Sequence, residues 1–495
     1  MARLLNIVRT KRLAVIGNGM ATCRLLDELI RHSALERYDV TVFGDEKGGA
    51  YNRVLLSRVL AGARPDEIST KPPAWYERSG VRLVDGATVA RLDPPKKALE
   101  TSDGREFRYD IAVIATGSRP QVPPIQGMTT PDGELRDGVF VYRTMDDCLR
   151  MRAFAQAGDN AVVLGGGLLG LEAAKVLSDS GLHVTVVHAA ETVLNAQLDA
   201  LGGEMLRLQI EQFGIFVRTG RTVDAIVGHG RVEGVVLDDG RALPADMVVL
   251  ACGVRPRVEL ASAAGLPVNR GILVNDNLAT EAPGIYALGE CVEHAGKTYG
   301  IVAPVWEQAA VLADVLSGTT PASRYRGSKQ FSRLKVAGVD VVSMGSLEPE
   351  LESDAVVQVV EERRKAYRKL ILRDGQLIGA MLVGDTRAAA TLVQSFDRGE
   401  PLPENPLEAL CSAALLDGPA SRERTVCTCH RVSDSTISEA VANGAQSVEA
   451  VGSATRAGTG CGSCRHEIGR LLARFVARSA MTAPVITPAA AVQTG

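Results

Sequence analysis

The sequence has few aromatic residues, no long hydrophobic run and almost no net charge. Only 4% of its 495 residues are Phe, Trp or Tyr, whereas 46% are hydrophobic and 50 are glycine. No apolar run approaches the ~18 residues needed to cross a bilayer, so we expect no membrane-spanning helix. A net charge of −3 gives no overall field that would favour nucleic acid or a membrane surface. The composition therefore predicts a glycine-rich α/β protein of about three or four domains.

Cysteine pairs are absent from most of the chain, which excludes a disulfide scaffold. Four of the nine cysteines gather near the C-terminus, and the other five are scattered singly: Cys23, Cys148, Cys252, Cys291 and Cys411. The basic residues 1–12 are not followed by the apolar segment and cleavage site of a signal peptide. We therefore expect a cytoplasmic protein.

A glycine-rich turn near residue 165 organises the chain. Residues 161–164 predict a buried parallel strand and residues 171–177 a helix, and the spacing G-x-G-x-x-G between them places Gly165, Gly167 and Gly170. In dinucleotide-binding folds the first glycine permits the tight turn, the second admits a pyrophosphate, and the third lets helix and strand pack closely. The helix N-terminus would then face the phosphates.

A second copy of this turn lies near the N-terminus, after a predicted strand at 12–16. It contains, in order, Gly17, Gly19, Met20, Ala21 and Thr22. Thr22 replaces the third glycine, which weakens the expected close packing of the helix but keeps both glycines that face the phosphates. The chain therefore predicts two dinucleotide sites.

The residue after the second strand of each unit contacts the ribose in such folds. In the N-terminal unit, Asp45 or Glu46 suits a ribose hydroxyl. In the nested unit, the strand 183–187 ends at His188. This residue is neither the acid that favours the 2′-hydroxyl of NAD nor an arginine for the phosphate of NADP. The choice of coenzyme stays open, with NADH slightly favoured.

Three later segments resemble those of flavoproteins with two dinucleotide domains. The predicted return strand 109–117 ends in Ala115, Thr116 and Gly117. Residues 283–291 contain Gly289 and Glu290, where an acid, usually Asp, contacts the ribityl chain. The helix predicted from Ala303, which includes Trp306, would direct its N-terminus at the flavin ring. Gly253 lies in the turn that closes the nested domain, residues 246–256.

The fold class expected from these motifs is α/β, with two nested Rossmann-like domains. We place the FAD-binding domain at 11–120 and 250–322, with an antiparallel excursion at 81–106, and the NAD(P)H-binding domain at 121–249. A small α+β domain is expected at 323–398, a linker at 399–423, a small helical metal-binding domain at 424–478, and a disordered tail at 479–495. In the helical domain we expect one helix over 433–451, with Ser435 as its cap.

Four cysteines in two short-spaced pairs predict a thiolate site: Cys427, Cys429, Cys461 and Cys464. Each pair would supply two ligands from one loop. Zinc also takes four thiolates, but zinc ribbons usually space both pairs as C-x₂-C. The single residue between Cys427 and Cys429 favours a [2Fe–2S] cluster, with zinc or free thiols as the alternatives.

Taken in order, these motifs resemble a known family over residues 13–475. IGNGMA, YNRVLLS, ATGSRP, GGGLLGLEAA, IYALGEC, YGIVAPVWEQA and LKVAGVDV are similar to the FAD/NAD portion of the assimilatory nitrite reductase large subunit. The cysteine segment resembles the bacterioferritin-associated ferredoxin type of [2Fe–2S] domain. No cysteine follows Cys464, where full nitrite reductases continue into a sirohaem region with more cysteines. The expectation is a stand-alone electron-transfer subunit.

The resemblance implies a path from NAD(P)H through FAD and the cluster to a molybdenum-containing nitrate reductase catalytic subunit. Flavoprotein disulfide reductases carry a redox-active cysteine pair after the first βαβ unit, but Tyr51 to Ser57 contains no cysteine. In related flavoproteins a basic residue of this stretch pairs with an acid of G-x-x-G-x-E near the flavin. The matching residues here are Arg53 and Glu172, and Ser57 of the same stretch is a further candidate for binding the cofactor.

Two other functions fit the same motifs. One is a reductase for a different acceptor, such as rubredoxin or ferredoxin. The other is a redox-sensing interaction protein that uses its cluster to dock a regulator. The oligomeric state stays open, with a homo-oligomer as one option.

Overall fold

The computed structural model describes residues 10–156, 158–320, 322–411, 425–427, 430–460, 462, 464–465 and 467–473. The chain divides into two compact units, 1–413 and 414–495, and each is described here by itself. No helix within these described ranges combines the length and the apolar character needed to cross a membrane.

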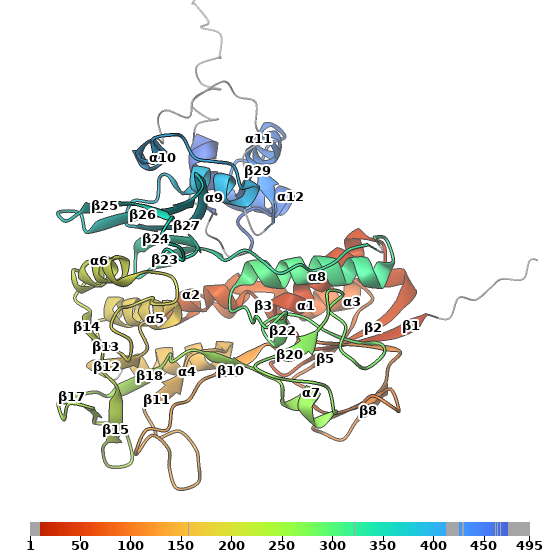
Figure 1. Cartoon of the computed structure of the whole chain (residues 1–495). Coiled ribbons are helices and arrows are strands. Elements are labelled where there is room, and N and C mark those ends of the chain that lie inside the picture. Colours follow the sequence, from red (N-terminus) through yellow and green to blue (C-terminus); the bar gives the residue numbers. More distant parts are fainter. Residues whose placement is uncertain are drawn as a thin grey trace, which may run out of the picture. The chain divides into compact units, whose positions relative to one another are not determined.

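The first sheet of unit 1 is parallel and combines strands from two distant parts of the chain. In spatial order it contains β21 (Ile285–Ala287), β9 (Ile111–Ile114), β1 (Lys11–Ile16), β2 (Tyr38–Gly44) and β5 (Arg82–Asp85). Two helices, α1 (Met20–Arg31) and α8 (Val302–Ser317), pack against each other beside it (Figure 1). The apolar runs of β1 and β9 are almost completely buried, as expected of parallel strands covered on both faces.

The second sheet is also parallel and lies between the two halves of the first in sequence. Its order is β11 (Val139–Val141), β18 (Met247–Leu250), β12 (Asn160–Leu164), β13 (His183–His188) and β14 (Phe216–Thr219). Its helices are α4 (Met145–Ala155), α5 (Leu168–Asp179) and α6 (Ala200–Glu211). Strands β10 (Ser118–Pro120) and β19 (Val254–Pro256) pair where the chain leaves and re-enters the first sheet. This nesting confirms the predicted fold class.

Smaller antiparallel sheets complete these two layers. One contains β6 (Val89–Asp93), β7 (Ala98–Thr101) and β8 (Glu106–Arg108), and another β15 (Val223–Val227), β16 (Gly234–Leu237) and β17 (Ala242–Pro244). The remaining short elements are β3 (Ala50–Tyr51), α2 (Leu56–Leu60), β4 (Ser69–Lys71), α3 (Pro73–Arg78), α7 (Glu259–Ala263), β20 (Ile272–Val274) and β22 (Val292–His294).

The antiparallel excursion starts later than predicted. Residues 82–85 form β5, which pairs in parallel with β2 at the edge of the first sheet, so assigning them to the excursion was wrong. An edge strand with one exposed side alternates apolar and polar residues whichever way it runs. The sequence pattern alone therefore did not distinguish the two directions.

The third sheet is antiparallel, in the order β23 (Phe331–Val336), β24 (Val339–Gly345), β27 (Gln376–Val383), β26 (Ala366–Arg373) and β25 (Ala355–Glu361). Helix α6 packs on β24, β26 and β27, and α9 (Ala389–Arg398) packs on β27. A short helix, α10 (Pro406–Cys411), follows. Buried residues of this sheet share one core with those of α5 and α6, so it is attached to the second sheet through an apolar interface.

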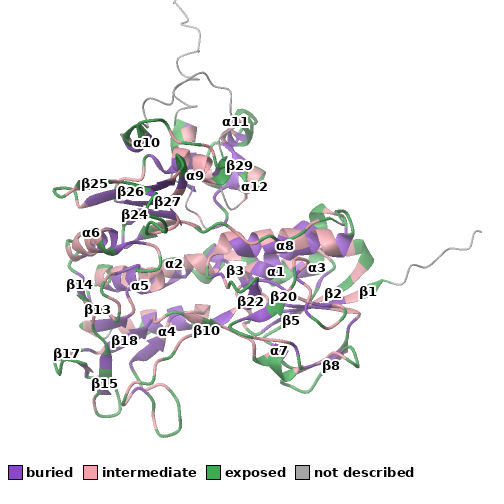
Figure 2. Ribbon diagram, in the orientation of Figure 1, coloured by how far each residue is buried: buried purple, intermediate pink, exposed green. Residues whose placement is uncertain are grey.

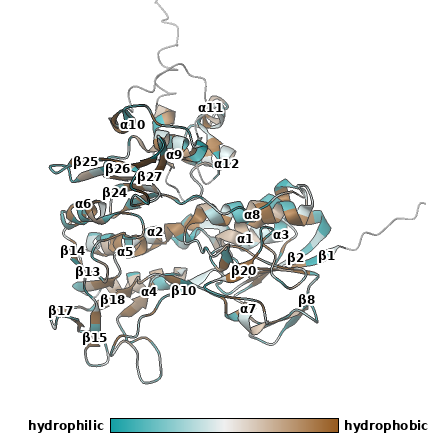
Figure 3. Ribbon diagram, in the orientation of Figure 1, coloured by the Kyte–Doolittle hydropathy of each residue, from teal (hydrophilic) through white to brown (hydrophobic). Residues whose placement is uncertain are grey.

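Buried residues follow the strands, whereas the connecting loops are mostly exposed (Figure 2). The same strands, β18 and β27 for example, consist largely of hydrophobic residues (Figure 3). The interface between the second and third sheets also contains polar groups. The buried carboxylate of Asp199, which caps α6, accepts hydrogen bonds from the Tyr367 hydroxyl at 2.5 Å and the Lys369 ammonium at 2.8 Å.

Unit 2 contains β28 (Thr425–Cys427), β29 (Val432–Ser433), α11 (Asp434–Ala442) and α12 (Val448–Thr455). The prediction of one helix over 433–451 capped by Ser435 was wrong. Ser433 caps α11 by accepting a hydrogen bond from the Thr436 amide at 3.2 Å. Gly444, whose φ of +102° is unfavourable in a helix, lies between the two helices.

Candidate functional site

A deep cavity lies where the first and second sheets meet, and it encloses about 1460 Å³ of space, including space open to solvent. Its lining comes from the first glycine turn, the end of β2, the 49–56 stretch, the β9–β10 return, the start of α5 and the start of α8. Thirteen residues predicted from the sequence line it: Gly17, Gly19, Met20, Ala21, Asp45, Glu46, Arg53, Ala115, Thr116, Gly117, Glu172, Gly289 and Glu290.

The first glycine turn forms one wall of this cavity. Gly17 has a φ of +111°, and a Cβ there would lie 2.2 Å from the carbonyl oxygen of Ala115, so only glycine fits. A Cβ on Gly19, in contrast, would have no neighbour within 4 Å, which leaves backbone accessible beside the start of α1. The Thr22 hydroxyl donates a hydrogen bond of 2.6 Å to the Gly17 carbonyl. Threonine at the third position therefore stabilises the turn, whereas the sequence predicted weaker packing.

The second glycine turn repeats this construction on the second sheet. Gly165 has a φ of +122°, and its Cβ would lie 2.2 Å from the Ala251 carbonyl oxygen. A Cβ on Gly170 would lie 1.9 Å from the Gly165 carbonyl oxygen, whereas Gly167 has open space beside it. These three glycines and Gly253 are not part of the cavity lining. Leu168, Leu169 and Glu172, which belong to helix α5, do line the cavity. The second glycine turn therefore lies outside the cavity that the first turn lines, and helix α5 connects the second turn to that cavity.

His188 lies directly against the second turn, because a Cβ on Gly166 would come within 2.9 Å of the His188 ring. Burial lowers the pKa of His188 below its usual value. The ring also approaches Asn195 Oδ1 at 3.3 Å. The backbone amide of Arg221 donates to the His188 carbonyl at 3.1 Å, so the structure places an arginine next to the end of β13, although its guanidinium pairs with Asp239.

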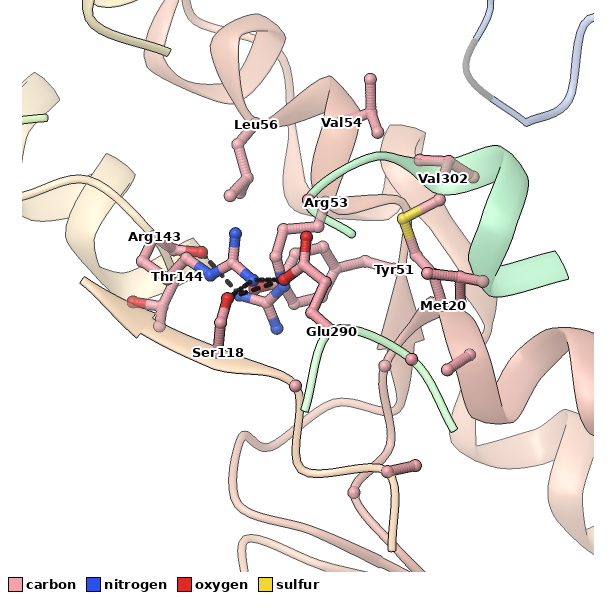
Figure 4. Close-up of a pocket in the computed structure, with 18 of the residues that line it drawn as sticks. Met20, Tyr51, Arg53, Val54, Leu56, Ser118, Arg143, Thr144, Glu290 and Val302 are labelled. Carbon is pink, nitrogen blue, oxygen red and sulfur yellow. Dashed lines mark hydrogen bonds and ion pairs between the residues drawn. The ribbon is translucent and has the colours of Figure 1, made fainter. Parts of the chain in front are cut away.

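A polar cluster occupies the centre of the cavity (Figure 4). The carboxylate of Glu290 accepts a hydrogen bond from the Ser118 hydroxyl at 2.7 Å and forms an ion pair with Arg143. The Arg143 guanidinium also donates to the Ser118 hydroxyl at 2.7 Å. Ser118, Arg143 and Glu290 come from three separate segments and meet in space. Sequence reasoning found Glu290 but missed Arg143, whose only signal is its place between β11 and the capped start of α4.

Arg53 lies beside this cluster and pairs with a different acid from the one predicted. Its guanidinium donates to Glu46 Oε1 at 2.6 Å and to the Arg143 carbonyl at 2.5 Å. The Tyr51 hydroxyl donates to the second oxygen of Glu46 at 2.6 Å. The described residues contain no ion pair between Arg53 and Glu172, so the predicted pair is not formed. Glu46 lies two residues after the end of β2, and both its carboxylate oxygens contact the 51–53 stretch.

Glu172 lines the cavity without a cationic partner among the described residues. Burial raises the pKa of its carboxyl group to about 7, and a hydrogen bond with Ser57 opposes this increase. Ser57 itself is not part of the lining. The Glu172 side chain is thus able to hold or release a proton near neutral pH.

The start of α8 contributes apolar side chains. Val302 and Val305 line the cavity, but Trp306 does not. The indole of Trp306 is only 7% exposed, and the Arg24 guanidinium lies 5.6 Å from its ring centroid. The structure therefore does not bring Trp306 to the cavity. Elsewhere at its rim, Asp45 accepts a hydrogen bond of 2.7 Å from Arg257.

In unit 2, two of the four predicted cysteines are described. Cys427 and Cys464 are 0% and 3% exposed and belong to one apolar cluster with Ile437, Val451 and Ile468. Cys429 and Cys461 lie outside the described residues. Two thiols buried in one core, from segments 37 residues apart, fit the donor set of a thiolate-bound cluster.

Three family matches cover most of the chain. Residues 11–311 match "Pyridine nucleotide-disulphide oxidoreductase", residues 331–400 match "Rubredoxin NAD+ reductase C-terminal domain", and residues 425–474 match "BFD-like [2Fe-2S] binding domain". The first and third confirm the predicted cofactors, namely FAD, NAD(P)H and a [2Fe–2S] cluster.

The chain is similar to curated proteins of nitrogen metabolism. It is 36% identical over 486 residues to the assimilatory nitrate reductase electron transfer subunit of Bacillus subtilis, covering 97% of this chain and 62% of that protein. It is 35% identical to the nitrite reductase (NADH) large subunit of Escherichia coli, covering 92% and 54%. The chain thus spans less than two thirds of the length of these relatives.

Among solved structures, the ferredoxin reductase for the CYP199A2 system of Rhodopseudomonas palustris is 26% identical, with a TM-score of 0.70, and the match covers 81% of this chain and 97% of that one. The NADH:rubredoxin oxidoreductase of Clostridium acetobutylicum is 25% identical, with a TM-score of 0.66 and coverage of 81% and 99%. Since the nested sheets, the two glycine turns and a match over more than half its length agree, this chain belongs to the pyridine nucleotide-disulphide oxidoreductase family.

Proposed function

We propose that this protein is a flavoprotein oxidoreductase that carries electrons from NAD(P)H to a partner catalytic subunit, that of an assimilatory nitrate reductase. The observation that carries the proposal is the order of sites on one chain: two separate glycine turns followed by a cluster-binding domain. The similarity to the electron transfer subunit of Bacillus subtilis supports the acceptor.

FAD fits the cavity between the first two sheets. Gly17, Gly19, Met20 and Ala21 would receive its pyrophosphate, because a turn at a helix start offers backbone N–H groups and the positive end of the helix dipole. Asp45 suits a ribose hydroxyl, and Ala115, Thr116 and Gly117 close the opposite wall. Gly289 and Glu290 would hold the ribityl chain, with Ser118 and Arg143 fixing the Glu290 carboxylate. When bound, FAD accepts a pair of electrons and releases them singly.

The nicotinamide coenzyme would bind at the second turn, over Gly165, Gly167 and Gly170, with Gly253 opposite. His188 does not supply a charge for a 2′-phosphate, because its lowered pKa keeps the ring neutral at pH 7. The guanidinium of Arg221 is engaged by Asp239. These two observations support NADH over NADPH.

Two side chains act on the proton and charge balance of the cavity. Glu172, with a pKa of about 7, is the candidate to hold a proton near the site of reduction. Arg53 is a positioning residue in this structure, because its hydrogen bonds join Glu46 to the backbone that carries Arg143. We propose these two, with Ser57 as the hydrogen-bond partner of Glu172, as the residues that govern reduction.

The cluster would be held by Cys427, Cys429, Cys461 and Cys464, and it supplies one-electron transfer. The partner is proposed to be a molybdenum-containing catalytic subunit. A ferredoxin-like or rubredoxin-like acceptor is the second candidate, favoured by the similarity to rhodocoxin reductase of Rhodococcus erythropolis, 30% identical over 342 residues. A redox sensor would not need to oxidise NADH in repeated turnovers.

The test is reconstitution. Purified full-length protein, mixed anaerobically with NADH and a nitrate reductase catalytic subunit, should form nitrite with matching NADH consumption. Ferredoxin and rubredoxin serve as competing acceptors. Reduction of either at a higher rate than nitrate would replace the proposed partner, and NADH oxidation limited to one equivalent would favour the sensor.

A further inference from the structure

An unprotected edge strand lies on the third sheet. Among the described residues, strand β25 pairs only with β26, in seven consecutive pairs without a register shift. Its residues 355–360 read AVVQVV and contain no proline and no charge. Edge strands of soluble proteins normally carry lysine, proline or a bulge, because their free backbone groups otherwise pair with another chain. Strand β25 has none of these protections before its last residue, Glu361, which is paired with Arg368.

One side of β25 is apolar and uncovered. Val357 and Val359 pack towards α9 and α10 in the core of the third sheet. Val356 and Val360 point to the other side, as their partners Ile371 and Tyr367 on β26 do. Helix α6 packs over β24, β26 and β27 on that side, but Val356 and Val360 remain 43% and 37% exposed. The edge therefore presents both free backbone groups and valine side chains.

The two turns that flank β25 carry opposite charges. The preceding stretch, 348–354, contains three glutamates and one aspartate, and the following stretch, 362–365, contains three basic residues and one glutamate. Glu348, Glu350 and Asp354 are paired within the chain, to Lys369 or Arg373. Glu352 and Arg363 are exposed and have no ion pair among the described residues. The two ends of β25 thus carry net charges of opposite sign, with Glu352 before the strand and Arg363 after it available for contacts outside the chain.

We propose that β25 pairs in antiparallel fashion with β25 of a second copy of this chain. An antiparallel pair of identical strands has a two-fold axis at its centre, so the stretch before one strand meets the stretch after the other. Glu352 of each copy then faces the basic turn around Arg363 of the other. The same geometry places the two-fold axis near Gln358, packs Val356 of each copy against Val360 of the other, and joins the two five-stranded sheets into one. A self-complementary edge of this kind selects a second copy over an unrelated chain.

Sedimentation velocity of the FAD-loaded full chain, over about 1 to 100 µM, tests the dimer. Val356→Lys with Val360→Lys places a charge at two apolar contacts in each copy. Losing about 1.4 kcal/mol at each contact corresponds to about a tenfold rise in Kd, and each contact occurs twice in a symmetric dimer. The dimer should therefore be lost. Leu273→Lys, an exposed apolar residue on β20, is the matched control and should leave it unchanged.

Charge reversal identifies the contact itself. Glu352→Arg and Arg363→Glu should each raise the Kd about tenfold or less, and the double variant should restore it. Reduction of small dyes by NADH reports that each variant is folded and flavin-loaded. A monomeric wild type throughout the range would overturn the proposal, as would a dimer that survives both lysines or a double variant no tighter than the singles. Binding of β25 by a different protein alone would appear as a monomer in this experiment.

Discussion

Glu172 provides the sharpest test of how this cavity controls reduction. Its carboxyl group is buried without a cationic partner in the described part of the chain, and its pKa is raised to about 7. Reduction of a bound flavin by hydride adds negative charge to the cavity. A neutral Glu172 tolerates that charge, whereas an ionised one opposes it at short range in a low-dielectric site. We therefore expect the protonated form to be the faster one.

The magnitude follows from the titration. With a pKa of about 7, roughly 90% of the carboxyl groups are neutral at pH 6 and roughly 10% at pH 8. If only the neutral form supports fast reduction, the rate constant falls about ninefold between these two values. Glutamine has the shape of the neutral acid and no titrating proton. Glu172→Gln should therefore keep the pH 6 rate at pH 8.

Anaerobic stopped-flow spectroscopy of flavin absorbance, with saturating NADH from pH 6 to 8, measures both profiles. Ser57→Ala is the matched control, because the Ser57 hydrogen bond lowers the pKa of Glu172. Removing it should move the midpoint to higher pH without flattening the profile. A wild-type rate that does not change with pH, or a Glu172→Gln profile that falls as steeply as the wild type, would refute this role.

The same pKa predicts a change in stability of the flavin-free chain. The pKa of Glu172 in the folded chain is raised above the usual 4.5, so the wild type loses stability as the pH rises from about 4.5 to 7. In urea melts, Glu172→Gln should therefore be more stable than the wild type by about 1–3 kcal/mol at pH 8 and equally stable at pH 4.5. Gly17→Ala should cost about 2–4 kcal/mol and prevent FAD retention, whereas Gly19→Ala should fold normally and only weaken FAD binding, in melts and flavin fluorescence. Arg143→Met should raise the FAD Kd about tenfold or more, and Arg150→Met, at an exposed ion pair, should not. Ending the chain after residue 418, or making Cys464→Ser, should keep dye reduction by NADH and abolish transfer to the partner subunit; nitrate reduction at the full rate by either variant would place the cluster outside the electron path.

The parts of the site that the sequence predicted are those fixed by the local backbone. Gly17 and Gly165 follow a strand, take a φ above +100° and approach a return strand within 2.2 Å, and no other residue type meets these requirements. Their spacing is therefore readable from one segment at a time. Glu290 is similar, since its place after β21 in the return of the chain determines where it lies. The nested order of the two sheets follows from the same local signals.

Which side chains of the cavity pair with one another could not be predicted from local motifs in this way. Arg143 reaches Glu290 across 147 residues of sequence, and Arg53 reaches the Arg143 backbone across 90. These contacts depend on how the two parallel sheets pack, which no short motif specifies. The motifs predicted a contact between Arg53 and Glu172. In the structure, Arg53 forms its ion pair with Glu46, which is closer to it in the sequence. Burial raises the pKa of Glu172, and no cation among the described residues lies beside it to oppose this.

The absence of that ion pair changes what Glu172 is able to do. An arginine at its side would hold the carboxylate ionised, with a lowered pKa, and leave it no proton to exchange near neutrality. Arg53 instead neutralises Glu46, and Glu46 in turn fixes the Tyr51 hydroxyl that accepts the Met145 amide of α4. One arginine thus joins Glu46 on the first sheet's side of the cavity to the backbone of the nested domain, while burial, opposed by the Ser57 hydrogen bond, raises the pKa of Glu172. We therefore propose that positioning by Arg53 and proton exchange by Glu172 are carried by two separate groups, where the motif predicted one ion pair near the flavin.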